Sequence, residues 1–319
     1  MMDNNETWDF FSRKTIIPII LFTIFTIYGI FSYLSGPDIL YIANFTYIGL
    51  ILSIGLILSV SAPRKLKSTV RRVIMLMIGS YLLLAVGVIS KEDLQIEGFF
   101  FHILYLVGGG ALIHYTIAKL GGPLIFGRGF CGWACWLSMI YDNLPFKTSP
   151  GRIKYLSYLR YVVLFISFGI VYYCYSIGYN ILNNPEQSLL WLISGVGIYY
   201  IVGISLAYIL KDNRAFCKYL CPIPPLQKIL GRFSLLKIKI DKDECVNCKL
   251  CEKKCPMDVK LLKYKNENKR ILSTECILCN ECSFVCPKSA VKLSLGLDHG
   301  GNYLVYSNEK NIKRITKRK

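Results

Sequence analysis

Eight cysteines between residues 245 and 287 repeat one spacing twice. In each run, three cysteines stand three residues apart, a fourth follows four residues later, and a proline comes directly after it. The runs are Cys245, Cys248, Cys251, Cys255 and Pro256, then Cys276, Cys279, Cys282, Cys286 and Pro287. Three thiolates at this spacing can hold three corners of a cubane iron–sulfur cluster, whereas the fourth corner needs a more distant ligand. The sequence therefore predicts two [4Fe-4S] clusters.

Two other uses of dense cysteines explain the pattern less well. Structural zinc sites usually take their four ligands as two pairs, which leaves the third cysteine and the proline of each run without a role. A disulfide framework is disfavoured because so dense an array of thiols stays reduced only in a cytosol-like compartment.

The double run resembles that of the two-cluster bacterial ferredoxins, in which the fourth cysteine of each run ligates the other cluster. The resemblance implies crosswise ligation in an α+β domain at residues 234–296. Strands are expected at 234–240 and 290–295, with a hairpin at 264–273. One implied ligand set is Cys245, Cys248, Cys251 and Cys286, and the other is Cys276, Cys279, Cys282 and Cys255.

The rest of the chain is mostly apolar. Hydrophobic residues make up 53% of the 319 residues, which is too many for an ordinary soluble domain. Six apolar runs of about twenty residues are each long enough to cross a bilayer. These runs are 15–34, 39–61, 73–90, 99–119, 156–178 and 188–210. The predicted fold class is an α-helical membrane protein with six transmembrane helices in residues 1–210 and a C-terminal two-cluster ferredoxin domain. The first run is expected to remain as an anchor, because it is too long for the apolar part of a signal peptide.

The charges in the loops predict the orientation. Residues 63–72 carry five Lys and Arg, and residues 119–154 carry further ones, whereas the alternate loops hold at most one lysine. By the positive-inside rule, both termini and the ferredoxin domain should face the cytoplasm, with the chain in the cell's cytoplasmic membrane.

Positive charge is concentrated near the C-terminus. The net charge is +18, and 24 Lys and Arg stand against 11 Asp and Glu from residue 211 onward. Such a surface suits anionic membrane lipids, and it can steer an acidic ferredoxin, a flavodoxin or a reductase subunit. No nucleic-acid-binding motif accompanies the charge, so nucleic acid is not an expected partner. Residues 297–319 are expected to form a basic arm.

A second repeat lies outside the ferredoxin domain. Residues 128–135, in a loop at 120–155, align without gaps on residues 214–221, in a linker at 211–233. Both read Arg-x-Phe-Cys-x-aromatic-x-Cys. Two cysteines four residues apart share one face of a helical turn, and Arg128 and Arg214 would favour their thiolate forms. We expect a shared cytoplasmic-side site for a further metal or iron–sulfur centre, although the same cysteines could simply be packing residues. The cysteines of the repeat are Cys131, Cys135, Cys217 and Cys221.

These two C-x3-C motifs and the two cluster runs resemble the membrane polyferredoxins of the NapH and NosR type, over about residues 120–290. The family supports electron supply to periplasmic reductases, so the resemblance implies membrane-bound electron transfer. Family members carry C-x3-C-P at both motifs. Here Pro222 follows the second motif, but Trp136 follows the first.

The predicted function is electron transfer between a quinone pool and a redox partner, as a component of a quinol-linked oxidoreductase. His114, near the end of the fourth apolar run, could bond a quinone head group or shuttle its proton; a buried histidine with satisfied hydrogen bonds is the alternative.

Two other functions stay open. The C-x3-C cysteines could serve a copper reductase or metal-handling protein, since soft thiolates suit Cu(I) and an accessory protein of cytochrome oxidase assembly has similar motifs. The chain could also be a redox sensor or a maturation subunit.

Overall fold

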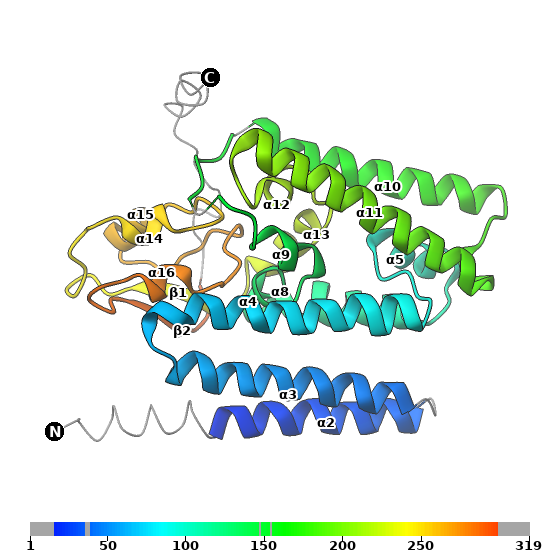
Figure 1. Ribbon diagram of the computed structural model, residues 1–319, viewed down its shortest axis with the longest axis horizontal. Coiled ribbons are helices and arrows are strands. Elements are labelled where there is room, and N and C mark those ends of the chain that lie inside the picture. The colour runs from blue at the N-terminus through cyan, green and yellow to red at the C-terminus, as the bar shows by residue number, and fades with distance from the viewer. Residues whose placement is uncertain (1–15, 36–38, 147, 154, 299–319) are drawn as a thin grey trace. The chain divides into compact units, whose positions relative to one another are not determined.

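The computed structural model describes residues 16–35, 39–146, 148–153 and 155–298. Most of the predicted basic arm at 297–319 therefore lies outside the described residues. The chain divides into two compact units, residues 1–78 and 79–319. Figure 1 labels their helices and strands.

The first unit consists of apolar helices. Helices α2 (Ile17–Ser35) and α3 (Ile39–Ser61) contain no charged residue and pack against each other. The Ser53 hydroxyl donates to the carbonyl of Pro18 at 2.8 Å. Helix α4 (Arg64–Tyr81) follows and continues into the second unit as the π-helix η2 (Leu82–Ile89). The basic segment 63–72, expected as a loop, thus forms the first turns of a helix.

Two long apolar helices of the second unit are α10 (Leu159–Ser176), which follows the 3-10 turn η4 (Tyr155–Tyr158), and α11 (Pro185–Leu210), which follows η5 (Ile181–Asn183). The side chain of Asn184 accepts a hydrogen bond from the Glu186 amide and so caps α11. Arg160, at the start of α10, pairs with Glu275 of the ferredoxin domain at 2.9 Å. We call this end of the helices the ferredoxin side and the opposite end the far side.

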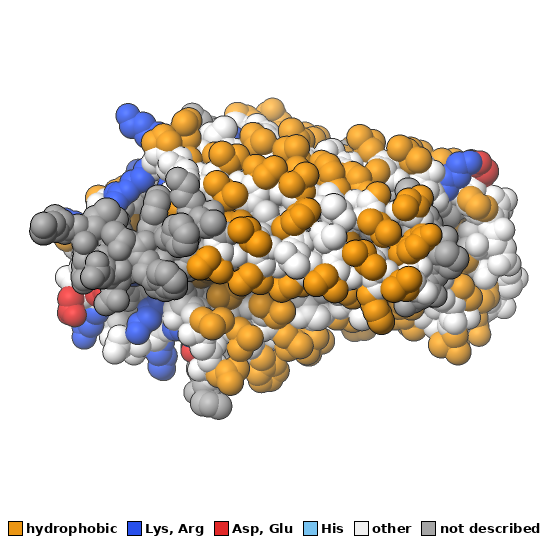
Figure 2. All heavy atoms as spheres, turned by 90° about the horizontal axis from the view of Figure 1, so that it is seen from below, with side chains coloured by type: hydrophobic (Ala, Val, Ile, Leu, Met, Phe, Trp, Pro, Cys, Tyr) orange, Lys and Arg blue, Asp and Glu red, His pale blue; other side chains and the backbone are white. Residues whose placement is uncertain are grey.

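The described residues contain five helical segments long and apolar enough to cross a membrane, and a bent helix pair that could make a sixth crossing. Figure 2 shows hydrophobic side chains covering the helices on one face, with charged side chains gathered near the helix ends. This confirms the predicted fold class. The five segments are 17–34, 42–61, 64–89, 155–176 and 185–210.

The fourth apolar run, predicted as one continuous helix at 99–119, is a broken segment. It contains α5 (Ile96–Tyr105) and a second stretch of α6 (Gly110–His114), η3 (Tyr115–Gly121) and α7 (Gly122–Phe126), and the two parts are bent by 111°. Leu106 takes a left-handed conformation, and three consecutive glycines follow at 108–110. Glycine is a poor helix former, which explains why the helix ends there.

Contacts show that α5 is re-entrant. Glu97, in its first turn, accepts a hydrogen bond from Tyr199, about halfway along α11. Tyr105, its last residue, donates to the carbonyl of Tyr179, in the connection between α10 and α11 on the far side. Helix α5 therefore begins inside the helical region and returns to the far side. The crossing to the ferredoxin side is made by residues 110–126.

The ferredoxin domain holds the two described strands of its sheet, β1 (Leu236–Ile240) and β2 (Val291–Leu295). They pair antiparallel, with Leu236 opposite Leu295, so both predicted strands are confirmed. The predicted hairpin at 264–273 is wrong, because this region begins within helix α15 (Leu261–Asn266). Leu261 and Tyr264 stand three residues apart and both turn into the core, which is a helical spacing. Short helices α14 (Leu250–Lys253) and α16 (Glu281–Phe284) complete the domain.

Short helices connect the membrane part to the ferredoxin domain. The first C-x3-C motif begins on α8 (Gly129–Trp133), which contains Cys131 but ends before Cys135, and α9 (Trp136–Tyr141) follows. Residues 211–233, expected to form a linker, contain α12 (Ala215–Tyr219) and α13 (Ile223–Gly231). Every residue of α12 is buried. This segment therefore packs as part of the second unit and does not act as a free tether.

Candidate functional site

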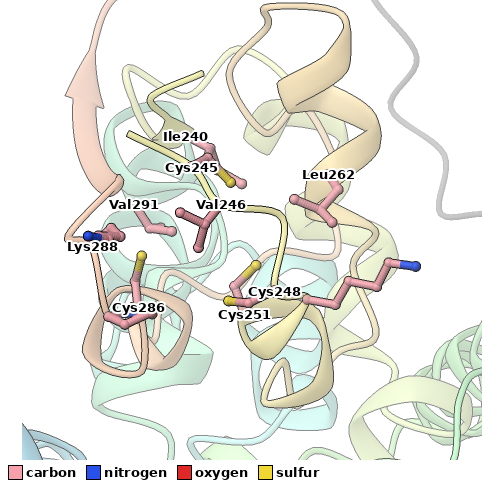
Figure 3. A pocket seen from close by; sticks show the side chains of 11 residues that line it. Ile240, Cys245, Val246, Cys248, Cys251, Leu262, Cys286, Lys288 and Val291 are labelled. Carbon is pink, nitrogen blue, oxygen red and sulfur yellow. The ribbon is translucent and has the colours of Figure 1, made fainter. Parts of the chain in front are cut away.

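The first implied ligand set surrounds one cavity of about 340 Å³. Figure 3 shows that its cysteine side chains face the same space, with Cys286 arriving from the second run. Apolar side chains such as Ile240 and Leu262 form the rest of the wall, together with Lys249 and Lys288. The cysteines that line this cavity are Cys245, Cys248, Cys251 and Cys286.

The second implied set surrounds another cavity of about 380 Å³, whose cysteines are Cys255, Cys276, Cys279 and Cys282. The Val259 amide donates a hydrogen bond to Cys255 Sγ at 3.4 Å. Burial raises the pKa of the Cys255 and Cys276 thiols to about 12, so these groups keep their protons until a metal displaces them. Four sulfur donors in an apolar cavity fit an iron–sulfur cluster at each place.

The two cysteine runs have positive backbone φ angles at equivalent positions. Positive φ angles occur two and four residues after the first cysteine, at Asn247 and Lys249 in the first run and at Leu278 and Asn280 in the second. Alternation of right- and left-handed residues turns successive amides toward one concave space, which is a common way to surround an iron–sulfur group. The repeated spacing is therefore matched by a repeated fold.

A third cavity, of about 570 Å³, lies where the C-x3-C motifs meet the membrane helices. All four cysteines of the second repeat line it: Cys131, Cys135, Cys217 and Cys221. Its other walls include Gln95, Tyr115, Lys119 and Tyr199. Within the described residues, no three His, Cys, Asp or Glu side chains are grouped closely enough to hold a single metal ion. The four cysteines thus surround a space and do not converge on a point.

The two motif arginines have different partners. Arg214 donates to the Cys131 carbonyl at 2.9 Å, approaches Cys217 Sγ at 3.9 Å and is paired with Asp142. Burial raises the pKa of the Cys217 thiol, and Arg214 only partly offsets this effect. Arg128 also lines the cavity, but its guanidinium pairs with Glu275 at 2.7 Å. The expectation that both arginines act mainly on the motif thiols is therefore too simple.

His114 lies beside the third cavity and is not among its lining residues. Its ring packs against Phe130 and Trp136, with ring centroids 5.3 and 5.6 Å away. Its Nε2 atom is buried and has no hydrogen-bond partner among the described residues. The same region contains Lys119, whose Nζ lies 3.2 Å from the centroid of the Phe130 ring and which sequence reasoning did not single out.

The first C-x3-C motif touches the second cluster run directly. Gly132 lies so close to the Ile277 carbonyl that a β-carbon would collide with it. Trp133 donates its indole N–H to the carbonyl of Leu278 at 2.9 Å. Cys131 packs in the same hydrophobic cluster as Cys279. The third cavity is therefore a direct neighbour of the second.

We expect Gly132→Ala to destabilise the protein, because the added methyl group meets a backbone carbonyl that cannot rotate away. Overpacking of this kind costs about 1–3 kcal/mol. Gly197→Ala in α11 is the matched control, since apart from its chain neighbours and its own helix backbone no atom lies within 4 Å of the added β-carbon. Thermal unfolding followed by the visible absorption of the iron–sulfur groups measures both variants. Equal transition temperatures for the two would contradict the close contact.

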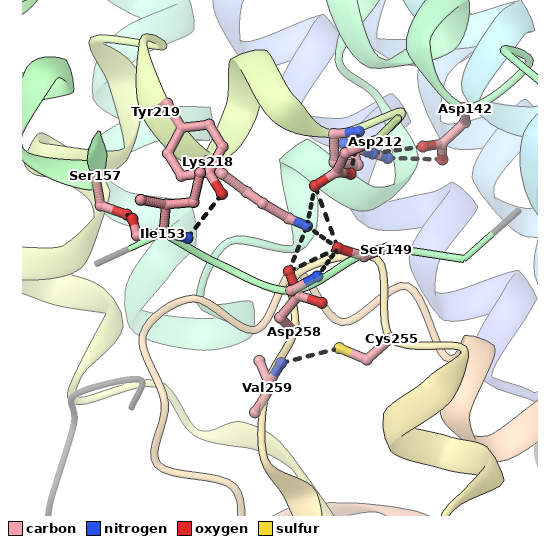
Figure 4. Close-up of polar contacts among 12 residues, drawn as sticks. Asp142, Ser149, Ile153, Ser157, Asp212, Lys218, Tyr219, Cys255, Asp258 and Val259 are labelled. Atoms are coloured by element: carbon pink, nitrogen blue, oxygen red, sulfur yellow. Dashed lines mark hydrogen bonds and ion pairs between the residues drawn. The ribbon is translucent and has the colours of Figure 1, made fainter. Parts of the chain in front are cut away.

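Two buried ion-pair networks join the ferredoxin domain to the membrane part, and the sequence had no pattern that pointed to them. In the first, the fully buried Lys218 of the second C-x3-C motif binds Asp212 at 2.6 Å and Asp258 at 2.5 Å (Figure 4). The Ser149 hydroxyl donates to Asp258 at 2.8 Å. Asp258 stands three residues after Cys255, so this network holds the chain next to a cysteine of the second cavity.

The second network is centred on Glu275, directly before Cys276. Burial alone would raise the pKa of this carboxyl, but four cations lower it well below its usual range. They are Arg128, Arg152, Arg160 and Lys228. Both networks therefore flank cysteines of the second cavity and fix it against the membrane part.

Two family models match this chain, one over the ferredoxin domain and one over the C-x3-C motifs. A family model described as a 4Fe-4S dicluster domain matches residues 237–303, and one described as a 4Fe-4S binding domain matches residues 116–145 and 194–242. The second match includes both C-x3-C motifs. No solved structure matches.

Curated relatives are similar over more than the cysteine motifs. An uncharacterized protein of Methanocaldococcus jannaschii is 31% identical over 209 residues, covering 62% of this chain and 75% of the relative. The ferredoxin-type protein NapH of Haemophilus influenzae is 30% identical over 218 residues, covering 60% of this chain and 69% of NapH. The methylamine utilization ferredoxin-type protein MauN of Paracoccus denitrificans is 29% identical over 160 residues, covering 47% of this chain and 56% of MauN.

Proposed function

The chain belongs to the NapH-like family of membrane-bound 4Fe-4S ferredoxin-type proteins, and on that basis we propose that it passes electrons between a membrane quinol pool and a soluble redox partner. Two of the relatives are named ferredoxin-type proteins and both matched models describe 4Fe-4S domains, which supports electron transfer through iron–sulfur clusters. The quinol, the number of iron–sulfur centres and the partner are the new parts of the proposal.

The observation that carries the proposal is the contiguity of three cysteine-lined cavities. The third cavity adjoins the second through Gly132 and Ile277. The second adjoins the first because α14, with Cys251, packs on α16, with Cys282. Iron–sulfur clusters accept and release single electrons when bound. The cysteines of the first two cavities would hold two [4Fe-4S] clusters by crosswise ligation, and those of the third would hold a further metal or iron–sulfur centre.

The third cavity, which lies at the membrane end of the three contiguous cavities, suits a quinol head group. Tyr115, Lys119 and Tyr199 bring polar groups to the wall of the third cavity from η3 and α11. Hydrogen bonds from such groups can orient a quinol beside the C-x3-C cysteines while apolar neighbours exclude water. His114, just outside the wall, would position Trp136 by ring contact.

The other end suits a soluble acidic protein. Cys248 of the first cavity is exposed, and the surface around it is basic. Its exposed lysines are Lys249, Lys253, Lys254 and Lys288. Opposite charge on a ferredoxin, a flavodoxin or a reductase subunit would steer it to this face. With the loop charges described above, the proposal places this face and both termini in the cytoplasm, at the cytoplasmic membrane.

Serine substitution of the C-x3-C cysteines tests the function. We expect Cys131→Ser or Cys217→Ser to abolish reduction of the two ferredoxin clusters by a menaquinol analogue, while leaving the EPR signals of these two clusters intact in the dithionite-reduced protein. Because the cysteines surround one cavity, the double variant should be no worse than either single one. Cys174→Ser is the control, since Cys174 lies on α10 outside that cavity. Full quinol-linked reduction in the double variant would contradict the proposed relay.

Copper reduction or handling is a second candidate function, supported by the soft character of the four sulfur donors that line the third cavity. Binding one copper ion would require three of them to move closer together than they lie in the described structure. Stoichiometric copper in the purified protein, lost in the same serine variants, would support it over the quinol-linked function.

A further inference from the structure

The re-entrant segment carries two acidic side chains into the helical region. Asp93 is buried, and Glu97 is partly buried in the first turn of α5. One carboxylate oxygen of each, Asp93 Oδ2 and Glu97 Oε2, is buried without a hydrogen-bond partner among the described residues. No ion pair with either residue occurs within the described part of the chain. Acids held unpaired inside a membrane protein are typical of proton pathways.

Glu97 is connected to the third cavity by hydrogen bonds. Its Oε1 accepts from Tyr199 at 3.1 Å and from Ser167 at 2.7 Å. Tyr199 itself lines the cavity. Its hydroxyl thus stands between Glu97 and the space proposed for the quinol, and it could pass a proton from one to the other. Tyr115, which also lines the cavity, is the further titratable group close to Glu97.

Asp93 is the next titratable group after Tyr199 and Glu97 on the way from the third cavity to the far side. The carboxyl groups of Asp93 and Glu97 lie close enough to influence each other electrostatically. The Asp93 amide donates to Ser188 Oγ at 3.0 Å, in the first turn of α11. The exposed ion pair of Lys91 with Glu186 marks the far side next to it. Titratable groups therefore lead from the third cavity to the side opposite the ferredoxin domain.

We propose that Tyr199, Glu97 and Asp93 carry protons between the third cavity and the far side. The inference rests on the proposed quinol oxidation. A quinol that becomes a quinone gives up two electrons and two protons. The electrons leave toward the cysteine-held centres on the ferredoxin side. Each proton passes to the Tyr199 hydroxyl as that hydroxyl releases its own proton to the Glu97 carboxylate, and then moves by way of Asp93 to the far side. Charge is thereby separated across the membrane.

The test uses the full-length protein with its iron–sulfur groups, reconstituted in liposomes with a menaquinol analogue in the bilayer. Ferricyanide outside is the electron acceptor for molecules whose ferredoxin domain faces outward, and a pH-sensitive dye reports the lumen. Wild-type protein should acidify the lumen as ferricyanide is reduced. Glu97→Gln keeps an amide oxygen that can accept the hydrogen bonds of Tyr199 and Ser167 but cannot carry a proton. We expect it to reduce ferricyanide roughly 100-fold more slowly, without acidifying the lumen.

Two further variants and a control sharpen the result. Tyr199→Phe and Asp93→Asn should also slow ferricyanide reduction and decrease lumen acidification. The test therefore does not depend on one variant folding well. Glu186→Gln changes an exposed acid outside the pathway and should behave as wild type. Infrared titration without quinol is an independent readout. A carboxyl band present in the wild type should be missing from Glu97→Gln.

The outcomes separate the two ideas. Wild-type rate and full lumen acidification in Glu97→Gln would overturn the proton pathway and leave the electron-transfer function standing. Wild-type protein whose clusters accept electrons from dithionite but never from quinol would overturn both.

Discussion

Cys286→Ser is expected to remove the cluster held by Cys245, Cys248 and Cys251, although Cys286 belongs to the other run. The reason is geometric, because these four side chains line one cavity. Serine offers a hard oxygen in place of a soft thiolate and should leave the fourth iron without its proper ligand. Cys255→Ser should remove the other cluster instead. EPR of the dithionite-reduced variants should show one surviving signal in each case, and a different one.

The pair of variants serves as its own control. Both change the fourth cysteine of a run, and both positions precede a proline. If each substitution erased the cluster of its own run, the crosswise arrangement would be refuted. Iron content should fall by about four irons per protein molecule in either variant, because each cluster holds four irons.

Glu275→Gln should cause the largest loss of stability away from the cysteines. The substitution leaves Arg128, Arg152, Arg160 and Lys228 without their common counterion. Breaking a buried ion pair by removing one partner costs about 3–5 kcal/mol. Because Glu275 precedes Cys276, quinol-linked reduction should also fall as the second cavity loses its anchor on the membrane part. Chemical denaturation followed by visible absorption gives the stability change.

Glu267→Gln is the matched control for this substitution. Glu267 pairs only at the surface, with Lys269 at 3.1 Å, and both side chains are 40% or more exposed. Surface pairs contribute about 0.2–1 kcal/mol. A loss of stability in Glu275→Gln no greater than in this control would mean that the four cations do not depend on the carboxylate.

The two strands and the cysteine runs of the ferredoxin part could be predicted from the sequence because their determinants are local, whereas its short helices, including α15 where a hairpin was predicted, could not. A cysteine spacing specifies which thiolates can reach one cube, and alternating apolar residues specify the two strands. The C-x3-C repeat predicted a shared site for its four cysteines. They line one cavity, but no three of them lie close enough to hold a single metal ion within the described residues, so the shared site stays a prediction. Hydropathy predicted five of the six membrane segments as helices for the same reason, since a helix of about twenty apolar residues satisfies its backbone by itself; it did not reveal the break in the fourth.

What the sequence alone determined, then, is the composition of the parts: membrane helices, two cysteine runs and a repeated motif. The tertiary structure decided the direction of α5, which an average over apolar residues cannot reveal, because Glu97 meets Ser167 and Tyr199 only after folding. The tertiary structure also gave the two motif arginines different ion-pair partners. Arg128 and Arg214 occupy the same position in the repeat, yet their carboxylate partners lie 147 and 72 residues away along the chain. Ion pairs form between side chains that packing brings together, and no local pattern records which ones those are.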